Sequence, residues 1–330
     1  MKILVTGSSG HLGEALVRHL TRLGHTAVGV DILPSTTTTH AASIVEREVA
    51  RRCMQGVDAV VHSATLHKPH VATHARQAFV DTNITGTLNL LEEAAAAQVQ
   101  AFVFTSTTST FGAALMPPAG APAAWITEEV VPRPKNIYGA TKVAAEDLCE
   151  LFARNHGLPC IVLRTSRFFP EADDDEGARA AFADANLKTN EFLHRRVDIA
   201  DVVGAHVLAL VKAREIGFDK FIISATTPFT QADLGQLRSD AASVLKRRAP
   251  RYEAIYAARG WAAPTQIDRV YVNERARTVL GWRPLYDFER VLSHLDRDED
   301  PRSALARQVG FKGYHGPDVN PGTGVPQRVA

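Results

Sequence analysis

Short apolar runs alternate with helical patterns along the first half of the chain. The runs read KILVTG, TAVGVD, DAVVHSA and AFVFTST, and amphipathic stretches such as HLGEALVRHLTRLG lie between them. These runs are apolar throughout rather than at every second position, so we expect strands that are buried on both faces. Strands joined by helices form βαβ units. The pattern therefore predicts an α/β fold with a doubly wound parallel sheet between two layers of helices.

Two later runs, PCIVLRTS and FDKFIISA, are expected to extend the same sheet, whereas the acidic segment FFPEADDDEGARAAFADANLKT breaks the pattern. Shorter helices and a Pro- and Gly-rich end follow. We predict a first domain of residues 1–167 plus about 197–227, and a smaller C-terminal lobe of residues 168–196 plus about 228–315. Residues 316–330 carry little apolar surface, and we expect them to form a flexible tail.

The composition narrows the class of partner. Thirty-seven basic and 36 acidic residues nearly balance, so we expect no long-range attraction to nucleic acid or to an anionic membrane. Cys53, Cys149 and Cys160 have no CxxC spacing, which indicates reduced, packed thiols. The chain opens with a strand pattern and has no run of 18 apolar residues. We therefore expect a cytoplasmic protein with neither signal peptide nor membrane span.

The segment TGSSGHLG follows the first strand and opens a helix. Its glycines, Gly7, Gly10 and Gly13, allow a tight turn, close approach of a pyrophosphate and close packing of helix on strand. Asp31 ends the second strand, where a carboxylate can bind the adenosine ribose and would repel a 2′-phosphate. The pattern predicts a Rossmann-type site for NAD rather than NADP. A simple glycine-rich turn and a solvated Asp31 are the alternatives.

Tyr138 and Lys142 are four residues apart in a stretch with helical periodicity, so one helix face carries a phenol beside an ammonium. A cation lowers the pKa of a neighbouring tyrosine, and the pair could form a phenolate near neutral pH that exchanges protons with a substrate alcohol. Hydroxyl side chains also crowd the end of AFVFTST, where open α/β sheets bind ligands. Each signal alone is weak, because such helix pairs and Ser/Thr-rich turns are common.

Together these segments resemble the extended short-chain dehydrogenase/reductase family, in its NAD-dependent epimerase/dehydratase branch. The resemblance is carried by TGSSGHLG, DAVVHSAT, NITGTLNLLEEA, FVFTSTTSTFG, YGATKVAAE and LGWRPLYDFERVL. It implies that Thr107 orients a substrate hydroxyl, that Tyr138 is the acid/base, and that Lys142 lowers the pKa of Tyr138 and binds the nicotinamide ribose. Ser106 and Thr108 are less favoured in place of Thr107. A homodimer, with the helices of Asn83 and Tyr138 against a second copy, is also implied.

The first domain is then the NAD-binding domain, and the C-terminal lobe binds substrate. The residues expected to contact NAD are Gly7, Ser9, Gly10, His11, Leu12, Gly13, Asp31, Ser43, Ile44, Ser63, Ala64, Thr65, Asn83, Thr105, Tyr138 and Lys142. For Asn83, an ordinary helix-interior amide is an equal alternative. His62 is expected to be a packed strand-end histidine.

The residues expected to contact substrate are His67, Lys68, Thr107, Thr108, Trp125 and Arg167. The loop LHKPHVATH holds several histidines but neither Cys nor carboxylate, so no metal site is predicted. Trp125 lies in an insertion that could bring it over the cleft to stack on a sugar, or into a core. Arg167 replaces the Asn that nucleotide-sugar epimerases usually carry. It could clasp a carboxylate or phosphate, or it could pair with Glu171 or Asp173.

The segment TSRFFPEADDD also resembles uronate dehydrogenases, which act on free sugar acids. We therefore expect an epimerase/dehydratase-type enzyme that works by hydride transfer at a secondary alcohol of a sugar or nucleotide sugar. One alternative is a dehydrogenase of a free sugar acid or another secondary alcohol, which would release NADH. Another is an NAD-binding regulatory protein that has kept the fold and lost the chemistry.

Overall fold

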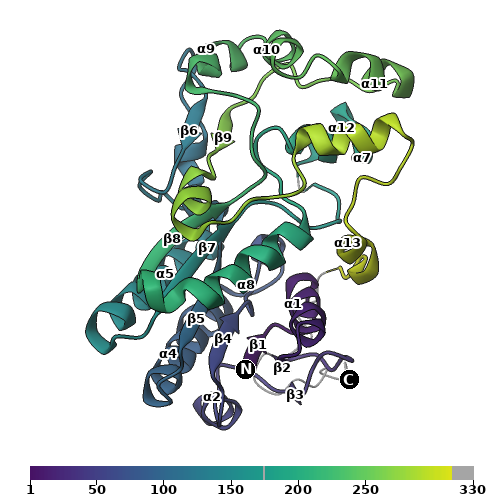
Figure 1. Ribbon diagram of the computed structural model, residues 1–330. Helices are drawn as coiled ribbons and strands as arrows, with labels where there is room; N and C mark the ends of the chain where they lie inside the picture. The colour runs from purple at the N-terminus through teal and green to yellow at the C-terminus, as the bar shows by residue number, and fades with distance from the viewer. Residues whose placement is uncertain (174, 314–330) are drawn as a thin grey trace, which may run out of the picture.

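One parallel sheet organises the first part of the molecule (Figure 1). The computed structural model describes residues 1–173 and 175–313, and within them seven strands pair in the order β3-β2-β1-β4-β5-β7-β8. Every neighbouring pair is parallel. The strands are β1 Lys2–Thr6, β2 Thr26–Asp31, β3 His40–Ala41, β4 Ala59–His62, β5 Ala101–Thr107, β7 Cys160–Thr165 and β8 Phe218–Ile223. The predicted doubly wound parallel sheet is confirmed.

Helices cover both faces of this sheet. On one face lie α1 His11–Arg22, α8 Ile199–Ile216 and α13 Ala304–Val309; on the other lie α2 Arg47–Cys53, α4 Gly86–Ala96 and α5 Ile137–His156. Successive strand residues point to opposite faces, so Ile3 and Val5 pack under α1 and α8 while Leu4 packs under α4. This arrangement explains why the central strands carry apolar residues on both faces rather than at every second position.

The order of the strands reverses between β1 and β4, because β2 and β3 extend the sheet on one side of β1 and the later strands extend it on the other. Open α/β sheets bind ligands outside the carboxyl ends of the strands at such a reversal. The loops that follow β1, β4 and β5 meet there. They carry the glycine turn, the 3₁₀ turn η1 Lys68–Ala72 and the hydroxyl-rich turn η3 Thr108–Leu115.

A second hydrophobic core lies away from the sheet. Its short strands, β6 Ala124–Ile126 and β9 Arg269–Tyr271, pair in parallel. Its helices are α7 Asp184–Glu191, α9 Leu234–Leu237, α10 Ala241–Arg248, α11 Tyr252–Arg259 and α12 Phe288–Asp296. We retain the predicted division into two parts as a proposal, with β6 reaching from the first segment to pair with β9.

The remaining elements are α3 Arg76–Val80, the π-helical turn η2 Asp81–Thr85, α6 Glu176–Ala181, η4 Gln231–Asp233 and η5 Ala276–Leu280. The predicted tail, residues 316–330, lies outside the described part of the chain. No helix within residues 1–173 and 175–313 is both long and apolar enough to cross a membrane.

Candidate active site

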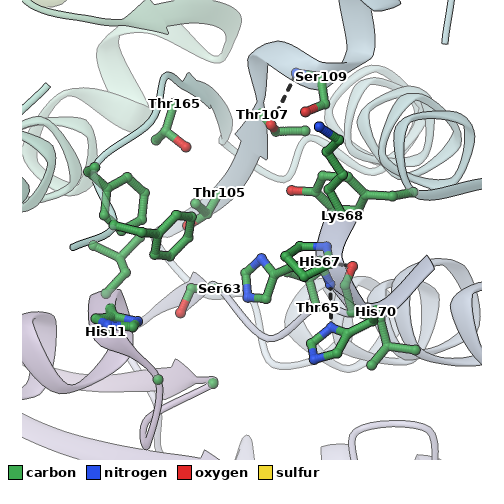
Figure 2. A pocket seen from close by; sticks show the side chains of 18 of the residues that line it. His11, Ser63, Thr65, His67, Lys68, His70, Thr105, Thr107, Ser109 and Thr165 are labelled. Atoms are coloured by element: carbon green, nitrogen blue, oxygen red, sulfur yellow. Dashed lines mark hydrogen bonds between the residues drawn. The ribbon is translucent and has the colours of Figure 1, made fainter. Parts of the chain in front are cut away.

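A cavity of about 910 Å³ follows the carboxyl ends of β1, β2, β4, β5 and β7. The glycine turn after β1 forms one end, and residues of the second core, including Arg269 and Tyr271 of β9, form the other. Figure 2 shows the wall between these ends, where His67, Thr105 and Thr107 surround the central space. The cavity therefore lies at the reversal point of the sheet.

The glycine turn has a backbone shape that other residues would not tolerate. Gly7 has φ +73°, and a Cβ placed on it would lie 2.8 Å from the backbone nitrogen of Ala64. A Cβ on Gly13 would lie 1.9 Å from the carbonyl oxygen of Gly7. Side chains are thus excluded where β1, the turn and α1 meet, and the N-terminus of α1 faces the cavity. This cradle fits the pyrophosphate of a dinucleotide.

Asp31 lies at the same end of the cavity. Its Oδ2 accepts a hydrogen bond of 3.0 Å from the backbone N–H of Ser9, and its Oδ1 accepts one of 2.9 Å from Leu33. A carboxylate oxygen can accept more than one hydrogen bond, so both oxygens can still accept from a ligand. The carboxylate is therefore held by the glycine turn itself, in the orientation that an adenosine ribose requires.

Most of the residues predicted to bind NAD line this cavity. They are Gly7, Ser9, Gly10, His11, Leu12, Gly13, Asp31, Ser43, Ile44, Ser63, Ala64, Thr65, Thr105 and Tyr138. The segment after β4, which forms one wall of the cavity, is held to the end of β1. Ser63 Oγ donates to the carbonyl of Thr6 at 2.6 Å, and Ala64 N donates to Thr6 Oγ1 at 3.2 Å.

Asn83, predicted either to contact the cofactor or to be an ordinary helix-interior amide, does not line the cavity. Its side-chain amide donates to Leu66 O at 3.3 Å and to Thr141 Oγ1 at 3.0 Å, and its Oδ1 accepts from Thr65 Oγ1 at 2.8 Å and from Leu66 N at 2.9 Å. Both donors and both acceptor directions are thus used within the protein. Asn83 is 1% exposed and ties α5 to the loop after β4, so it positions the site from behind.

Tyr138 and Thr107 meet on the cavity wall. Tyr138 lies in the first turn of α5, which begins where Asn136 Oδ1 accepts from Gly139 N at 3.0 Å. Thr107 ends β5, and its Oγ1 accepts a hydrogen bond of 3.1 Å from Ser109 N. The Thr107 side chain is close enough to the Tyr138 hydroxyl to lower the pKa of Tyr138. Two hydroxyl groups on one wall can hold the oxygen of a substrate alcohol between them.

Lys142 lies just behind this wall and is 1% exposed. Its Nζ donates to the carbonyl oxygen of Thr105 at 2.7 Å and lies 4.0 Å from the centre of the Phe104 ring. Burial lowers the pKa of Lys142 to about 7, although the nearby Glu146 carboxylate raises it in part. The ammonium therefore supports the end of β5 and does not project freely into the cavity.

The expectation that Lys142 makes Tyr138 a phenolate near neutral pH does not hold for the protein without a ligand. Burial raises the pKa of Tyr138 to about 12, and the Thr107 side chain only partly opposes that rise. The cause is desolvation, which disfavours the charged form of both groups. Sequence spacing predicts that the two side chains share a helix face, but it does not predict how completely both are removed from water.

Buried histidines hold the strand ends below the site. The ring of His62 is hydrogen-bonded through Nδ1 to Thr6 Oγ1 at 2.7 Å and through Nε2 to Thr87 Oγ1 at 2.9 Å. It is therefore a packed histidine, as predicted. His206 of α8 donates from Nδ1 to Val202 O at 2.8 Å, which leaves Nε2 as the acceptor for Thr105 Oγ1 at 2.8 Å. Burial lowers the pKa of His206 to about 4, so this contact uses the neutral ring.

Beneath Lys142 lies a buried ion pair that sequence reasoning did not identify. Arg164 of β7 binds the carboxylate of Glu146 through Nη2 at 2.6 Å and Nε at 3.0 Å, and Ser106 Oγ donates to Glu146 Oε1 at 2.5 Å. Both charged side chains are almost completely buried. With Ser106, the ion pair joins α5, β5 and β7; α5 carries Tyr138, β5 ends at Thr107, and Arg167 lies two residues after the end of β7.

Arg167 lines the substrate end of the cavity, together with His67, Lys68 and Thr108, as predicted. It also has acidic neighbours: its guanidinium lies 3.6 Å from Asp173 and 4.0 Å from Glu191, and Nη2 donates to Ala172 O at 2.8 Å. The ion-pair alternative is thus correct for Asp173, whereas Glu171 pairs with His11 instead. Asp173 and Glu191 therefore already balance part of the positive charge of Arg167.

Trp125, predicted either to stack on a sugar or to pack in a core, does not line the cavity. It lies in β6, pairs with Val270 of β9 and packs against the second core. The insertion that carries it completes a two-stranded sheet, and its position is that of the core-packing alternative.

Several lining residues were not identified from the sequence, among them Phe168, Phe169, Arg195, Arg269, Tyr271 and Lys312. The position of the two phenylalanines directly after β7 was an available signal, because strand ends line such sites. Arg269 and Lys312 come from a three-residue strand and from the end of the described chain, where no periodic pattern could place them. Among the described residues, no group of three or more His, Cys, Asp or Glu side chains is arranged to hold a metal ion.

Comparison of this chain with known proteins is consistent with the geometry of the site. Residues 3–223 match the model of the NAD dependent epimerase/dehydratase family. UDP-glucose 4-epimerase of Rhizobium meliloti (strain 1021) is 27% identical over 325 residues, which cover 88% of this chain and 94% of that one. UDP-glucose 4-epimerase of Streptomyces lividans is 29% identical over 189 residues, and that match spans only 54% of each chain. A match to uncharacterized protein y4nG of Sinorhizobium fredii, at 32% identity, spans 39% of that protein.

Solved structures show the same fold. UDP-N-acetylglucosamine 4-epimerase from Bacillus cereus has a TM-score of 0.62 at 20% identity, and the match covers 89% of this chain and 97% of that one. A short-chain dehydrogenase/reductase superfamily protein from Agrobacterium tumefaciens with bound NAD has a TM-score of 0.63 at 23% identity, covering 93% and 99%. The family match extends from the glycine turn through Thr107, Tyr138 and Lys142 to β8, and we conclude that this chain belongs to the NAD-dependent epimerase/dehydratase family of extended short-chain dehydrogenase/reductase enzymes.

Proposed function

We propose that this enzyme epimerises a sugar or nucleotide sugar by oxidising a secondary alcohol and reducing the resulting ketone from the opposite face. The observation that carries the proposal is that Tyr138 and Thr107 line one wall of a cavity whose other end is the Gly7–Gly13 cradle. The full-length similarity to a UDP-glucose 4-epimerase supports a nucleotide sugar as the substrate.

In this proposal Tyr138 and Thr107 handle the proton of the substrate hydroxyl. The Thr107 side chain favours the ionised form of Tyr138 and so lowers its pKa, against the larger effect of burial, while Thr107 Oγ1 also accepts a hydrogen bond from Ser109 N. A phenolate at Tyr138 would accept the hydroxyl proton during oxidation and return it to the ketone oxygen during reduction. Bound NAD would accept the hydride from the substrate carbon and give it back.

The far end of the cavity favours an anionic substrate. Arg167, Arg195 and Arg269 all line it. Arg195 Nη2 lies 2.9 Å from both Asp173 and Glu191, so much of its charge is balanced, whereas Arg269 forms no ion pair with a carboxylate of the described residues. Guanidinium groups bind phosphate and carboxylate with two parallel hydrogen bonds. A nucleoside diphosphate sugar and a free sugar acid both carry such a group, so a sugar-acid dehydrogenase is the second candidate.

Turnover of the cofactor separates the two candidates. Purified enzyme would be mixed with excess NAD and, one at a time, with UDP-sugars and free uronates, while NADH absorbance and the sugar product are both followed. Epimerisation predicts a new sugar without net NADH. Accumulation of NADH in step with an oxidised sugar would establish the dehydrogenase instead.

The role of Tyr138 is tested by Tyr138→Phe, with Tyr286→Phe as the matched control, because Tyr286 lies outside the lining of the cavity. We expect kcat of the Tyr138 variant to fall by roughly 10²–10⁴-fold, the usual contribution of a positioned acid/base. NAD affinity should change little, which an NADH fluorescence titration would measure. Full activity of Tyr138→Phe would favour a cofactor-binding regulatory protein over an enzyme that uses this residue.

We further propose a cytoplasmic homodimer. Cys53, Cys149 and Cys160 are all free and buried, which supports a reducing compartment. The helices α4 and α5 lie side by side on one face of the sheet, and they are the surface that the family resemblance assigns to the dimer.

A further inference from the structure

The last described residues of the chain return to the cavity of the cofactor. After α13, residues 311–313 run along its wall, and Lys312 and Gly313 line it together with His11 of the glycine turn. We call residues 311–313 the C-terminal strap. They are separated from the glycine turn by about three hundred positions in the sequence, so this contact is created by the fold alone.

Backbone hydrogen bonds and one ion pair hold the strap. The backbone N–H of Lys312 donates to Glu171 Oε1 at 3.3 Å and to His11 Nε2 at 3.2 Å, and that of Gly313 donates to Glu171 Oε1 at 3.1 Å. The Lys312 ammonium forms an ion pair with Glu14 in the first turn of α1. Glu14 and Glu171 are only 6% and 5% exposed, while the Lys312 side chain is 29% exposed. The strap thus lies on the outer side of two buried carboxylates that it helps to neutralise.

A third contact closes the arrangement. His11 Nε2 lies 2.9 Å from Glu171 Oε1, and the ring of Phe169 packs edge-on against the His11 ring with centroids 5.4 Å apart. His11 is the first residue of α1, beside the glycine turn, and Figure 2 shows it at the cavity wall below Thr105 and Thr107. Glu171 belongs to the loop after β7, which also carries Arg167. The contact therefore joins the cofactor end of the cavity to its substrate end.

We propose that the C-terminal strap, Glu171 and His11 form a clasp that retains bound NAD. A dinucleotide that lies on the glycine turn and extends toward Tyr138 must pass the line between His11 and Glu171. The strap lies on the outer side of His11 and Glu171 and is a third segment of the same barrier. The cofactor can therefore leave only when the contacts of the strap with Glu171 and Glu14 open. This role is independent of whether the substrate is epimerised or only oxidised.

The rate of cofactor release tests the clasp. NADH would be displaced from purified protein by excess NAD in a stopped-flow fluorescence experiment, with wild type, Lys312→Ala and Glu171→Gln compared. We expect release to accelerate about tenfold or more in both variants, because lost contacts of this kind act mainly on dissociation rates. Lys312→Arg, which keeps the charge, should restore slow release. Lys246→Ala is the matched control, since it removes an exposed lysine–glutamate pair of 3.0 Å with Glu253 far from the cavity.

Three results would overturn the clasp. One is a release rate within twofold of wild type for both variants. Another is slower release or tighter binding in Glu171→Gln, which would mean that Lys312 binds the cofactor directly and that Glu171 competes for it. The third is that the cofactor-free variants have a lower melting temperature than wild type, by an amount that fully accounts for their faster release. In that case Lys312→Arg would not restore the melting temperature.

Proteolysis gives a second measurement that does not depend on activity. Trypsin cuts after lysine, and the bond between Lys312 and Gly313 lies within the strap. If NAD and the strap stabilise each other, saturating NAD should slow cleavage at this bond several-fold, as identified by mass spectrometry of the fragments. Equal cleavage rates with and without NAD would contradict the proposal.

Discussion

At the scale of single residues, burial decides what Tyr138 and Lys142 can do. The two side chains are neighbours on α5, yet the pKa of Tyr138 is raised to about 12 and that of Lys142 is lowered to about 7, in both cases mainly because water is excluded. Each shift moves its group toward the uncharged form. The site without ligands is therefore arranged to hold a neutral phenol, and an ionised phenolate needs further stabilisation there.

Lys142 also gives a pH dependence of stability that can be measured. The pKa of Lys142 is lower in the folded protein than in the unfolded chain, so Lys142 lowers the free energy of unfolding. This unfavourable contribution is largest below about pH 7 and disappears as the pH rises toward the pKa of 10.5 in the unfolded chain. We expect Lys142→Met to raise the free energy of unfolding at pH 7 by on the order of 2–4 kcal/mol, and by less at pH 9. Urea unfolding of the cofactor-free protein at both pH values checks this; an equal difference at both would contradict it.

We propose that Asp31 determines the choice of cofactor at the same scale. Its carboxylate is held by Ser9 and Leu33 beside the glycine turn, where it would repel a 2′-phosphate. We expect Asp31→Ala to weaken NAD binding by about tenfold or more and to narrow the preference over NADP, since roughly 1.5–3 kcal/mol is typical for hydrogen bonds to a charged group. Calorimetric titration with both cofactors measures the change. Equal affinity of the wild type for NAD and NADP would refute the assignment.

At the scale of elements, the site depends on the way that α5, β5 and β7 are joined beneath it. The Glu146–Arg164 pair and Ser106 connect these three elements in a region that water does not reach. Tyr138 and Lys142 share α5 with Glu146, so a shift of that helix would move all of them together.

Removing one partner of this pair should be far more damaging than removing a surface pair of similar length. Arg164→Met leaves the Glu146 carboxylate buried without its cation, which typically costs about 3–5 kcal/mol. Arg51→Met removes an exposed ion pair of 2.7 Å with Glu48 and should have little measurable effect. Chemical denaturation of both variants makes the comparison. Similar midpoints for the two would show that the buried pair is not what holds these elements together.

At the same scale, sequence patterns predicted the long elements and missed the short ones. The strands β1, β2, β4, β5, β7 and β8 were visible because each contains a run of apolar residues. The strands β6 and β9 have three residues each, which is too short for a periodic signal, so the sequence left the position of Trp125 open. The role of Asn83 was left open for the same reason: its partners are Thr65 and Leu66 on another loop and Thr141 on another helix.

At the scale of the whole molecule, single side chains join distant parts of the chain. Asp201 of α8 accepts hydrogen bonds of 2.8 Å from the backbone of Leu285 and of Tyr286, and its carbonyl accepts one of 3.0 Å from the Trp282 indole. The buried carboxyl of Asp201 links the C-terminal segment to the face of the sheet, as the strap does at the cofactor end.

The proposed homodimer is also a property of the whole molecule. We expect the purified protein to have twice the mass of one 35.8 kDa chain in size-exclusion chromatography with light scattering. Leu151 of α5 is 36% exposed, and Leu151→Arg should shift the mass toward the monomer if α4 and α5 form the interface, because an unpaired charge would be buried there. A monomeric wild type, or a dimer that this variant leaves unchanged, would refute the proposed interface.

The sequence by itself determined the parallel sheet, the glycine cradle, Asp31 and the trio of Thr107, Tyr138 and Lys142. These features depend on local periodicity, on backbone shapes that only glycine allows, and on side chains at the ends of adjacent strands, all of which neighbouring residues specify. Only the tertiary structure decided the ionisation of Tyr138 and Lys142, the partners of Arg167 and the contact of Lys312 with the cofactor end. The physical reason is that burial and charge pairing depend on atoms brought together from remote parts of the chain.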